Sequence, residues 1–226
     1  MTIRAVVFDF DGVIANSEPL HYKGFRDVLA AEGIMLSEAD YYARYLGFDD
    51  AGAFLAIAAD RGLSWSPARI AGLVERKAIR LEELEREASV LFPGARAAIE
   101  RLARACPVAI ASGALRSEIL RVLERERLTR HFTAIVAAED TPVSKPAPDP
   151  YLRAVHLLSA ASPGPLAARD CVAIEDSHWG LRSARGAGLR TVGITHTYAA
   201  GALEDAELVV DHLDTLTWER LTSAFN

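Results

Sequence analysis

Cysteine is scarce in this chain: Cys106 and Cys171 are the only two among 226 residues. Two cysteines do not make a disulfide framework in a chain of this size, so we expect buried free thiols and a reducing, cytoplasmic environment. Long apolar runs are lacking too. Stretches such as 107–111 fall far short of the ~18–20 residues that a membrane span needs. Because the chain runs from Met1 almost directly into a strand-like segment, we expect no signal peptide.

Positive charge is also in short supply. The chain has 25 lysines and arginines against 31 aspartates and glutamates, a net charge of −6. This balance argues against the basic surface of a nucleic-acid-binding protein, and we expect neither nucleic acid nor a membrane as a partner. Hydrophobic residues make up 50% and charged residues 25%, which is typical of a globular protein with one large domain or two smaller ones.

Short apolar, β-branched runs alternate with helical patterns from residue 93 onwards. They predict strands at 107–112, 134–138, 171–175, 190–194 and 208–211. This alternation indicates βαβ units and a parallel sheet. The run 3–10 predicts one more strand, which must join that sheet because a single strand cannot form one. We therefore predict an α/β fold, with a Rossmann-like core of residues 1–15 and 88–226 and an all-helical insertion at 16–87.

Polar residues follow four of the predicted strands at the edge where parallel sheets bind ligands. They are Asp9 and Asp11, Ser112 and Gly113, Lys145, and Glu175 and Asp176. Clustered carboxylates without histidine or cysteine favour a hard cation, most commonly Mg²⁺. A lysine, and a serine beside a glycine, are phosphate-binding groups. An aspartate can attack phosphorus to form an aspartyl-phosphate, while a second carboxylate acts as general acid and base.

Simpler interpretations of the same residues exist. Asp11-Gly12 and Ser112-Gly113 are common turn pairs, and 175–177 could form the N-cap of the next helix. Capping and metal binding are compatible there. The occurrence of all four sets in order favours phosphoryl chemistry over four unrelated turns.

These residues resemble the four motifs of the haloacid-dehalogenase (HAD) superfamily. The matching segments are 9–13, Ser112, Lys145 with Pro146, and Glu175 with Asp176, and 16–21 and 144–149 strengthen the likeness. The insertion after the first motif resembles the branch with a helical C1 cap, which includes β-phosphoglucomutase and phosphoglycolate phosphatase. The resemblance spans nearly the whole chain.

The resemblance implies a role for each matching residue. Asp9 would be the nucleophile and a Mg²⁺ ligand; Asp11 would be the general acid and base and a metal ligand through its backbone carbonyl. Ser112, Gly113 and Lys145 would hold the phosphoryl oxygens. Asp176 would ligate the metal, and Glu175 would be a ligand or its partner. The first strand would lie centrally, between the strands that end at Ser112 and Asp176.

The helical insertion offers four substrate-binding candidates: His21, Arg44, Gly47 and Lys77. The loop 45–50 resembles the family's substrate-specificity loop, and Lys77 falls where β-phosphoglucomutase has a cap lysine. The mutase also has an arginine just after its loop glycine, where this chain has Asp49-Asp50. That difference argues against a mutase, which must grip a second phosphate. For His21, an exposed helical position without function is an equal alternative.

The sequence therefore predicts a Mg²⁺-dependent phosphatase of small phosphorylated metabolites, such as sugar or polyol phosphates, acting as a monomer or weak homodimer. A β-phosphoglucomutase would use the same residues. A 2-haloacid dehalogenase does not need Asp11, and a phosphonatase needs a Schiff-base lysine that has no recognisable counterpart in the insertion. A receiver-like phosphoacceptor domain would be a non-enzymatic alternative, but such domains are about half this length.

Overall fold

The computed structural model describes residues 2–46, 48, 50–87 and 89–225, with Glu87 described by its backbone only. The chain divides into two compact units. One unit, here called the core, comprises Met1–Asn16 and Val90–Asn226, and the other, the cap, comprises Ser17–Ser89. Within the described residues, no helix combines the length and the apolar character that a membrane crossing requires.

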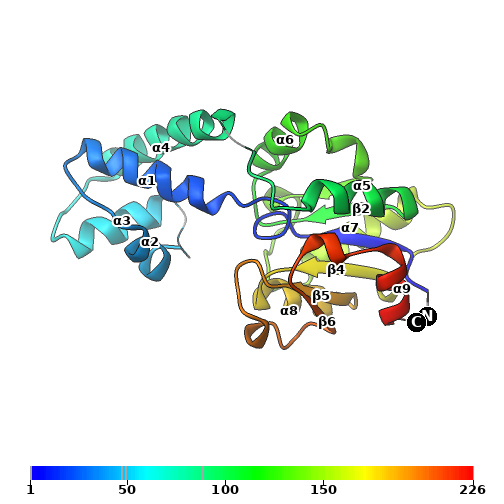
Figure 1. Cartoon of the computed structure of the whole chain (residues 1–226). Helices are drawn as coiled ribbons and strands as arrows, with labels where there is room; N and C mark the ends of the chain where they lie inside the picture. Colours follow the sequence, from blue (N-terminus) through cyan, green and yellow to red (C-terminus); the bar gives the residue numbers. More distant parts are fainter. Residues whose placement is uncertain (1, 47, 49, 88, 226) are drawn as a thin grey trace. The chain divides into compact units, whose positions relative to one another are not determined.

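A parallel six-stranded sheet, in the order β3-β2-β1-β4-β5-β6, forms the centre of the described part of the core (Figure 1). The strands are β1 (Ala5–Phe8), β2 (Val108–Ala111), β3 (Ala134–Val136), β4 (Cys171–Glu175), β5 (Arg190–Ile194) and β6 (Leu208–Val210). The predicted α/β fold and the central place of the first strand are confirmed: Val6 pairs with Val108 on one side and with Val172 on the other.

The first strand is shorter than the predicted 3–10. Asp9 still donates its amide to the carbonyl of Ile174 at 2.9 Å. The amide of Phe10 turns instead to the Asp9 side chain, at 2.7 Å. The backbone pairing of β1 with its neighbouring strand therefore ends at Asp9, the first residue of the site.

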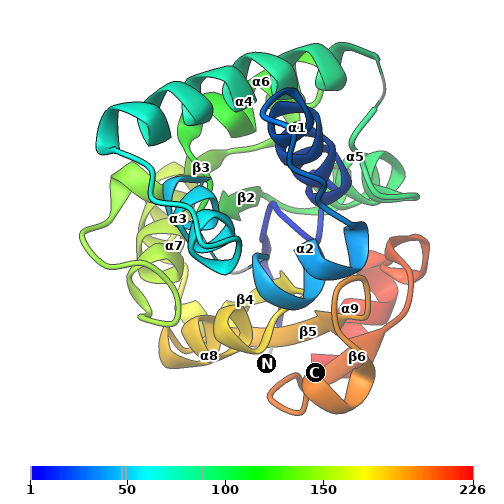
Figure 2. The same cartoon turned by 90° about the vertical axis from the view of Figure 1, so that its left-hand side faces the viewer.

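Helices cover both faces of the sheet, with α7 and α8 on one side and α5 and α9 on the other (Figure 2). Alternate strand residues such as Ala5 and Val7 pack with Tyr151 and Ala154 of α7 in one buried cluster. The core helices are α5 (Ala95–Ala105), α6 (Arg116–Arg125), α7 (Asp149–Ala161), α8 (His178–Gly186) and α9 (Trp218–Phe225), with 3₁₀ turns η1 (Thr129–His131), η2 (Ala138–Asp140), η3 (Ala168–Asp170), η4 (Ala200–Ala202) and η5 (Leu213–Thr215).

The helix α9, which follows the last strand, has no predicted counterpart in the sequence. At eight residues it spans barely two turns, too short for a clear apolar period. Its start does carry a signal: Thr217 Oγ1 accepts the amide of Arg220 at 3.2 Å, as an N-cap does.

The described part of the cap is all-helical, as predicted. Its helices are α1 (Glu18–Ala31), α2 (Glu38–Arg44), α3 (Asp50–Asp60) and α4 (Pro67–Glu87). Ser37 caps α2 by accepting the amide of Asp40, and Ser66 precedes the proline that opens α4. The cap has its own apolar centre, in which the rings of Phe25 and Phe54 meet at 4.9 Å between centroids.

Candidate active site

Asp9 lies directly after β1 with only 8% of its surface exposed. Its Oδ1 accepts the amide of Phe10 at 2.7 Å and pairs with the ammonium of Lys145 at 2.8 Å. The Asp9 backbone is bonded in turn to Ile174 of β4. Both the backbone and the carboxylate are therefore held in place at the carboxyl edge of the sheet.

Lys145 joins Asp9 to Glu175. Its Nζ lies 2.6 Å from Glu175 Oε1 and 5.1 Å from the centroid of the Tyr151 ring. Burial by itself would lower the pKa of the Lys145 ammonium, but the charges of Asp9 and Glu175 outweigh it and raise that pKa. Lys145 therefore carries its positive charge across the neutral pH range.

Three carboxylates converge at this edge: Asp9, Glu175 and Asp176 each place one oxygen within 4.8 Å of the others. Burial raises the pKa of Glu175, and it raises that of Asp176 to about 6; the negative charge of Asp9 adds to both shifts. The single ammonium of Lys145 does not balance the three carboxylates, so the cluster carries surplus negative charge. An all-oxygen cluster with surplus negative charge fits a hard divalent cation such as Mg²⁺.

Two glycines seat the carboxylates against the backbone. Gly12 has φ +77°, and a Cβ there would lie 2.0 Å from Asp176 Oδ2. A Cβ on Gly180, in α8, would lie 2.0 Å from both oxygens of Glu175. The motif Asp-x-Asp-Gly thus needs its glycine for the space that Asp176 occupies as well as for the left-handed backbone.

Ser112 and Gly113 follow β2, the strand next to β1. Ser112 is 2% exposed; its amide donates to the carbonyl of Val136 at 3.0 Å, and its Oγ accepts the amide of Ala114 at 3.0 Å. A Cβ on Gly113 would meet nothing within 4 Å, so open space adjoins this backbone. Asp11 lies in the turn after β1 and is exposed.

Three residues around this edge were not predicted from the sequence: Tyr151, His196 and Thr197. The Tyr151 hydroxyl, fully buried, donates to Glu175 Oε1 at 2.6 Å. After β5, His196 places Nδ1 2.9 Å from the carbonyl oxygen of Gly12, and the side chain of Thr197 acts to lower the pKa of Asp176. The available signal was the polar run 195–197 directly after a predicted strand, at the ligand-binding edge.

In the cap, His21 and Lys77 come together. Lys77 is 0% exposed, and its Nζ lies 2.8 Å from His21 Nδ1 and 2.5 Å from Asp50 Oδ1. The same ammonium lies 4.6 Å from the centre of the Phe25 ring. The lysine is therefore neutralised by an aspartate of its own unit.

The other two cap candidates do not join this pair. Arg44 ion-pairs with Asp60 of α3 at 2.5 Å, and its guanidinium lies 5.4 Å from the Tyr45 ring centre. Gly47 lies outside the described residues. Both cap cations that sequence reasoning singled out are thus paired with aspartates.

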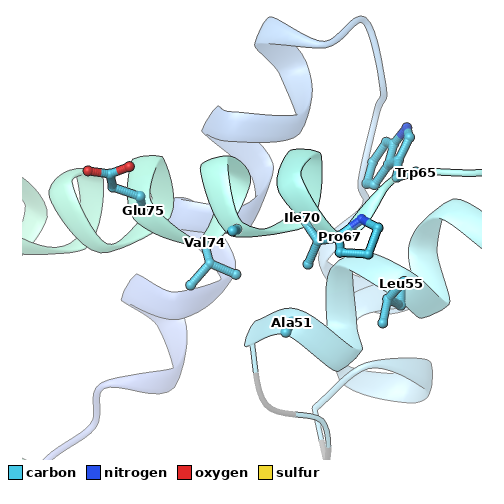
Figure 3. A pocket seen from close by; sticks show the side chains of 8 residues that line it. Ala51, Leu55, Trp65, Pro67, Ile70, Val74 and Glu75 are labelled. Carbon is cyan, nitrogen blue, oxygen red and sulfur yellow. The ribbon is translucent and has the colours of Figure 1, made fainter.

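The cap also contains an apolar pocket of about 540 Å³ between α3 and α4 (Figure 3). Its lining is Ala51, Leu55, Trp65, Pro67, Ile70, Ala71, Val74 and Glu75. None of these is a predicted site residue, and only Glu75 is charged. Without a cation or a cluster of donors, this pocket lacks the groups that bind a phosphate.

Comparison with known proteins identifies the family of this chain. The profile of the haloacid dehalogenase-like hydrolases matches residues 3–188. Protein CbbY of Rhodobacter capsulatus is 33% identical over 208 residues, 89% of each chain, and hexitol phosphatase B of Escherichia coli is 30% identical over 194 residues, 84% of this chain and 82% of that protein. The structure of a CbbY variant of Rhodobacter sphaeroides in complex with xylulose-(1,5)bisphosphate superposes with a TM-score of 0.77 at 26% identity, covering 95% of this chain and 96% of that one. The chain is a member of the haloacid dehalogenase-like hydrolase family.

Proposed function

We propose that the protein is a Mg²⁺-dependent phosphatase that hydrolyses phosphate monoesters of small sugars or polyols through an aspartyl-phosphate at Asp9. The observation that carries this proposal is the buried Asp9 carboxylate, held on Oδ1 by the Phe10 amide and Lys145 beside Glu175 and Asp176. The name of one relative, hexitol phosphatase B, and the xylulose-(1,5)bisphosphate in the structure of the CbbY variant support a phosphorylated carbohydrate as substrate.

In the first step, an oxygen of Asp9 bonds to phosphorus while the bond from phosphorus to the leaving oxygen breaks. Lys145 offsets the charge of the attacking carboxylate and of the phosphoryl group. Ser112 accepts a bond from Ala114, so its own O–H can donate to a phosphoryl oxygen. Fully buried Tyr151 and Glu175 keep the ammonium of Lys145 in place.

Asp11 acts as the general acid in the first step and as the general base in the second. It gives its proton to the departing alkoxide in the first step and takes one from water in the second, when water attacks phosphorus and the bond to Asp9 breaks. Its exposed position in the turn after β1 suits a group that must exchange protons with substrate and water. The result is one alcohol and one inorganic phosphate, with Asp9 and Asp11 restored.

Asp9, Glu175 and Asp176 would hold the metal, with the Asp11 carbonyl as a further ligand implied by the family resemblance. Bound there, Mg²⁺ supplies positive charge that lowers the repulsion between an anionic nucleophile and an anionic ester.

Hydrolysis is favoured over mutase chemistry by the charges within the cap. A mutase must grip a second phosphate, whereas Lys77 and Arg44 are each ion-paired with an aspartate. Neither cation offers an uncompensated charge to a bisphosphate.

The proposal is tested by measuring phosphate release from a panel of sugar and polyol phosphates with Mg²⁺ and with EDTA. Asp9→Asn keeps the shape of the side chain but removes the nucleophile, and we expect a loss of more than about a hundredfold in turnover with the fold retained. The matched control is Asp205→Asn, which removes an exposed carboxylate paired with Arg185. Turnover of Asp9→Asn within about tenfold of wild type would remove Asp9 from the nucleophile role.

A further inference from the structure

The loop that follows β5 reaches the turn after β1. Thr195 anchors this loop to the neighbouring strand: its amide donates to the carbonyl of Val210 at 3.0 Å, and its Oγ1 donates to Asp211 Oδ1 at 3.0 Å. These two hydrogen bonds hold the backbone directly before the next residue, His196.

His196 makes two contacts at once. Its ring stacks on the ring of Phe92, with 3.9 Å between centroids and 15° between planes. Its Nδ1 lies 2.9 Å from the carbonyl oxygen of Gly12. Because a carbonyl oxygen can only accept, Nδ1 must carry a proton and donate it here, in the neutral ring as in the charged one.

Gly12 and Phe92, the two partners of His196, belong to the same hydrogen-bonded backbone turn. The amides of Ile14 and Ala15 donate to the carbonyl of Phe10 at 2.8 and 2.9 Å, and the amide of Gly12 donates to Ala15 at 2.9 Å. Phe92 joins this turn by donating its amide to Ile14 at 3.0 Å. None of these four bonds uses the Gly12 carbonyl. The hydrogen bond from His196 therefore restrains a group of the turn that the backbone bonds do not hold.

We propose that His196 is a positioning residue for Asp11: it holds the Gly12 carbonyl and so fixes the turn that carries Asp11. The catalytic consequence rests on the proposed function, in which Asp11 is the general acid and base. Thr197, the adjacent residue, interacts with Asp176, so the loop that holds the turn also reaches a carboxylate of the site. Displacing a reacting group by ~1 Å can lower a rate ~100-fold, which is why one distant hydrogen bond can matter.

The test compares three variants. His196→Leu removes the donor, and we expect kcat for a sugar phosphate to fall about 10- to 100-fold with KM changed less than about threefold. With p-nitrophenyl phosphate, whose leaving group needs little protonation, the loss should be smaller. His196→Asn can place an N–H near the position of Nδ1 and should retain kcat within about threefold of wild type. Phe92→Leu removes the ring stack but not the hydrogen bond and should behave likewise.

Either of two kinetic results would overturn the proposal: kcat of His196→Leu within about threefold of wild type for the sugar phosphate, or kcat of His196→Asn falling as far as that of His196→Leu. If the leucine variant does not fold, His196→Gln replaces it, because its amide nitrogen corresponds to Nε2 rather than Nδ1.

A second measurement does not need activity. Amide hydrogen exchange at Ile14 and Ala15, followed by NMR, should accelerate in His196→Leu and stay at the wild-type rate in His196→Asn. If the wild-type protein hydrolyses no ester, the proposed function fails. Unchanged exchange in His196→Leu would then separately refute the claim that His196 holds the turn.

Discussion

The buried ion pair of the cap predicts an asymmetry between its two partners. Lys77 is 0% exposed and pairs with Asp50, with His21, the Phe25 ring and the charge of Glu18 also close to it, whereas the Asp50 side chain is 32% exposed. Removing the aspartate leaves an ammonium that water cannot reach. Removing the lysine leaves a carboxylate that water can solvate. We therefore expect Asp50→Asn to destabilise the cap more than Lys77→Met does.

The magnitudes follow from this difference in exposure. A buried charge that loses its counter-charge costs about 3–5 kcal/mol, and we place Asp50→Asn near 3 kcal/mol because His21 and Phe25 remain as partners. Lys77→Met fills nearly the same volume without a charge, and the exposed Asp50 recovers its hydration, so we expect about 1 kcal/mol. The double variant should be close to Lys77→Met.

The assay is urea denaturation followed by the fluorescence of Trp65. This is the only tryptophan of the cap segment, so Trp179→Phe and Trp218→Phe make a background in which the signal reports on the cap. A free energy of unfolding for Lys77→Met that is equal to or lower than that of Asp50→Asn would refute the reasoning, since it would mean that the aspartate depends on the lysine and not the reverse.

Three further predictions concern stability. Burial raises the pKa of Cys106 and of Cys171 from 9.0 to about 12, so the unfolded chain loses thiol protons first as pH rises. Stability from these thiols is fully present below pH 9 and is lost between pH 9 and about 12; thermal unfolding that is unchanged between pH 8 and pH 10.5 would contradict this. Gly180→Ala would drive a Cβ into the Glu175 carboxylate and should lower the free energy of unfolding by about 1–3 kcal/mol in chemical denaturation. Gly72→Ala, in α4 with nothing within 4 Å, should raise it by about 0.5–1 kcal/mol, and a loss there would contradict the open surface.

Local sequence patterns were sufficient to locate the six strands that the structure describes, but four of them are shorter than the predicted 3–10, 107–112, 134–138 and 208–211. The segments 171–175 and 190–194 are apolar, β-branched and bounded by turn signals, and they form β4 and β5 with the predicted ends. Asp9 and Asp176 could be predicted because each directly follows a strand, and Lys145 because it lies in the loop after β3; a parallel sheet brings such segments to one edge.

Contacts between distant helices could not be predicted in the same way. Lys77 meets Asp50 and His21 across 27 and 56 residues, and such pairing depends on which helix faces pack together. Tyr151 is a similar case, since nothing in a helical tyrosine shows that its hydroxyl meets a glutamate 24 residues later. His196 reaches Gly12 across 184 residues. These contacts arise from tertiary packing, which single-sequence periodicity does not encode.

The most direct test of the proposed phosphatase is a ³¹P NMR time course of the wild-type protein with Mg²⁺. The sample contains a hexitol phosphate and β-glucose 1-phosphate with a catalytic trace of the 1,6-bisphosphate. We predict that inorganic phosphate grows at the expense of the hexitol phosphate, that EDTA stops it, and that glucose 6-phosphate does not accumulate. Accumulation of glucose 6-phosphate faster than inorganic phosphate would contradict the phosphatase and favour the mutase.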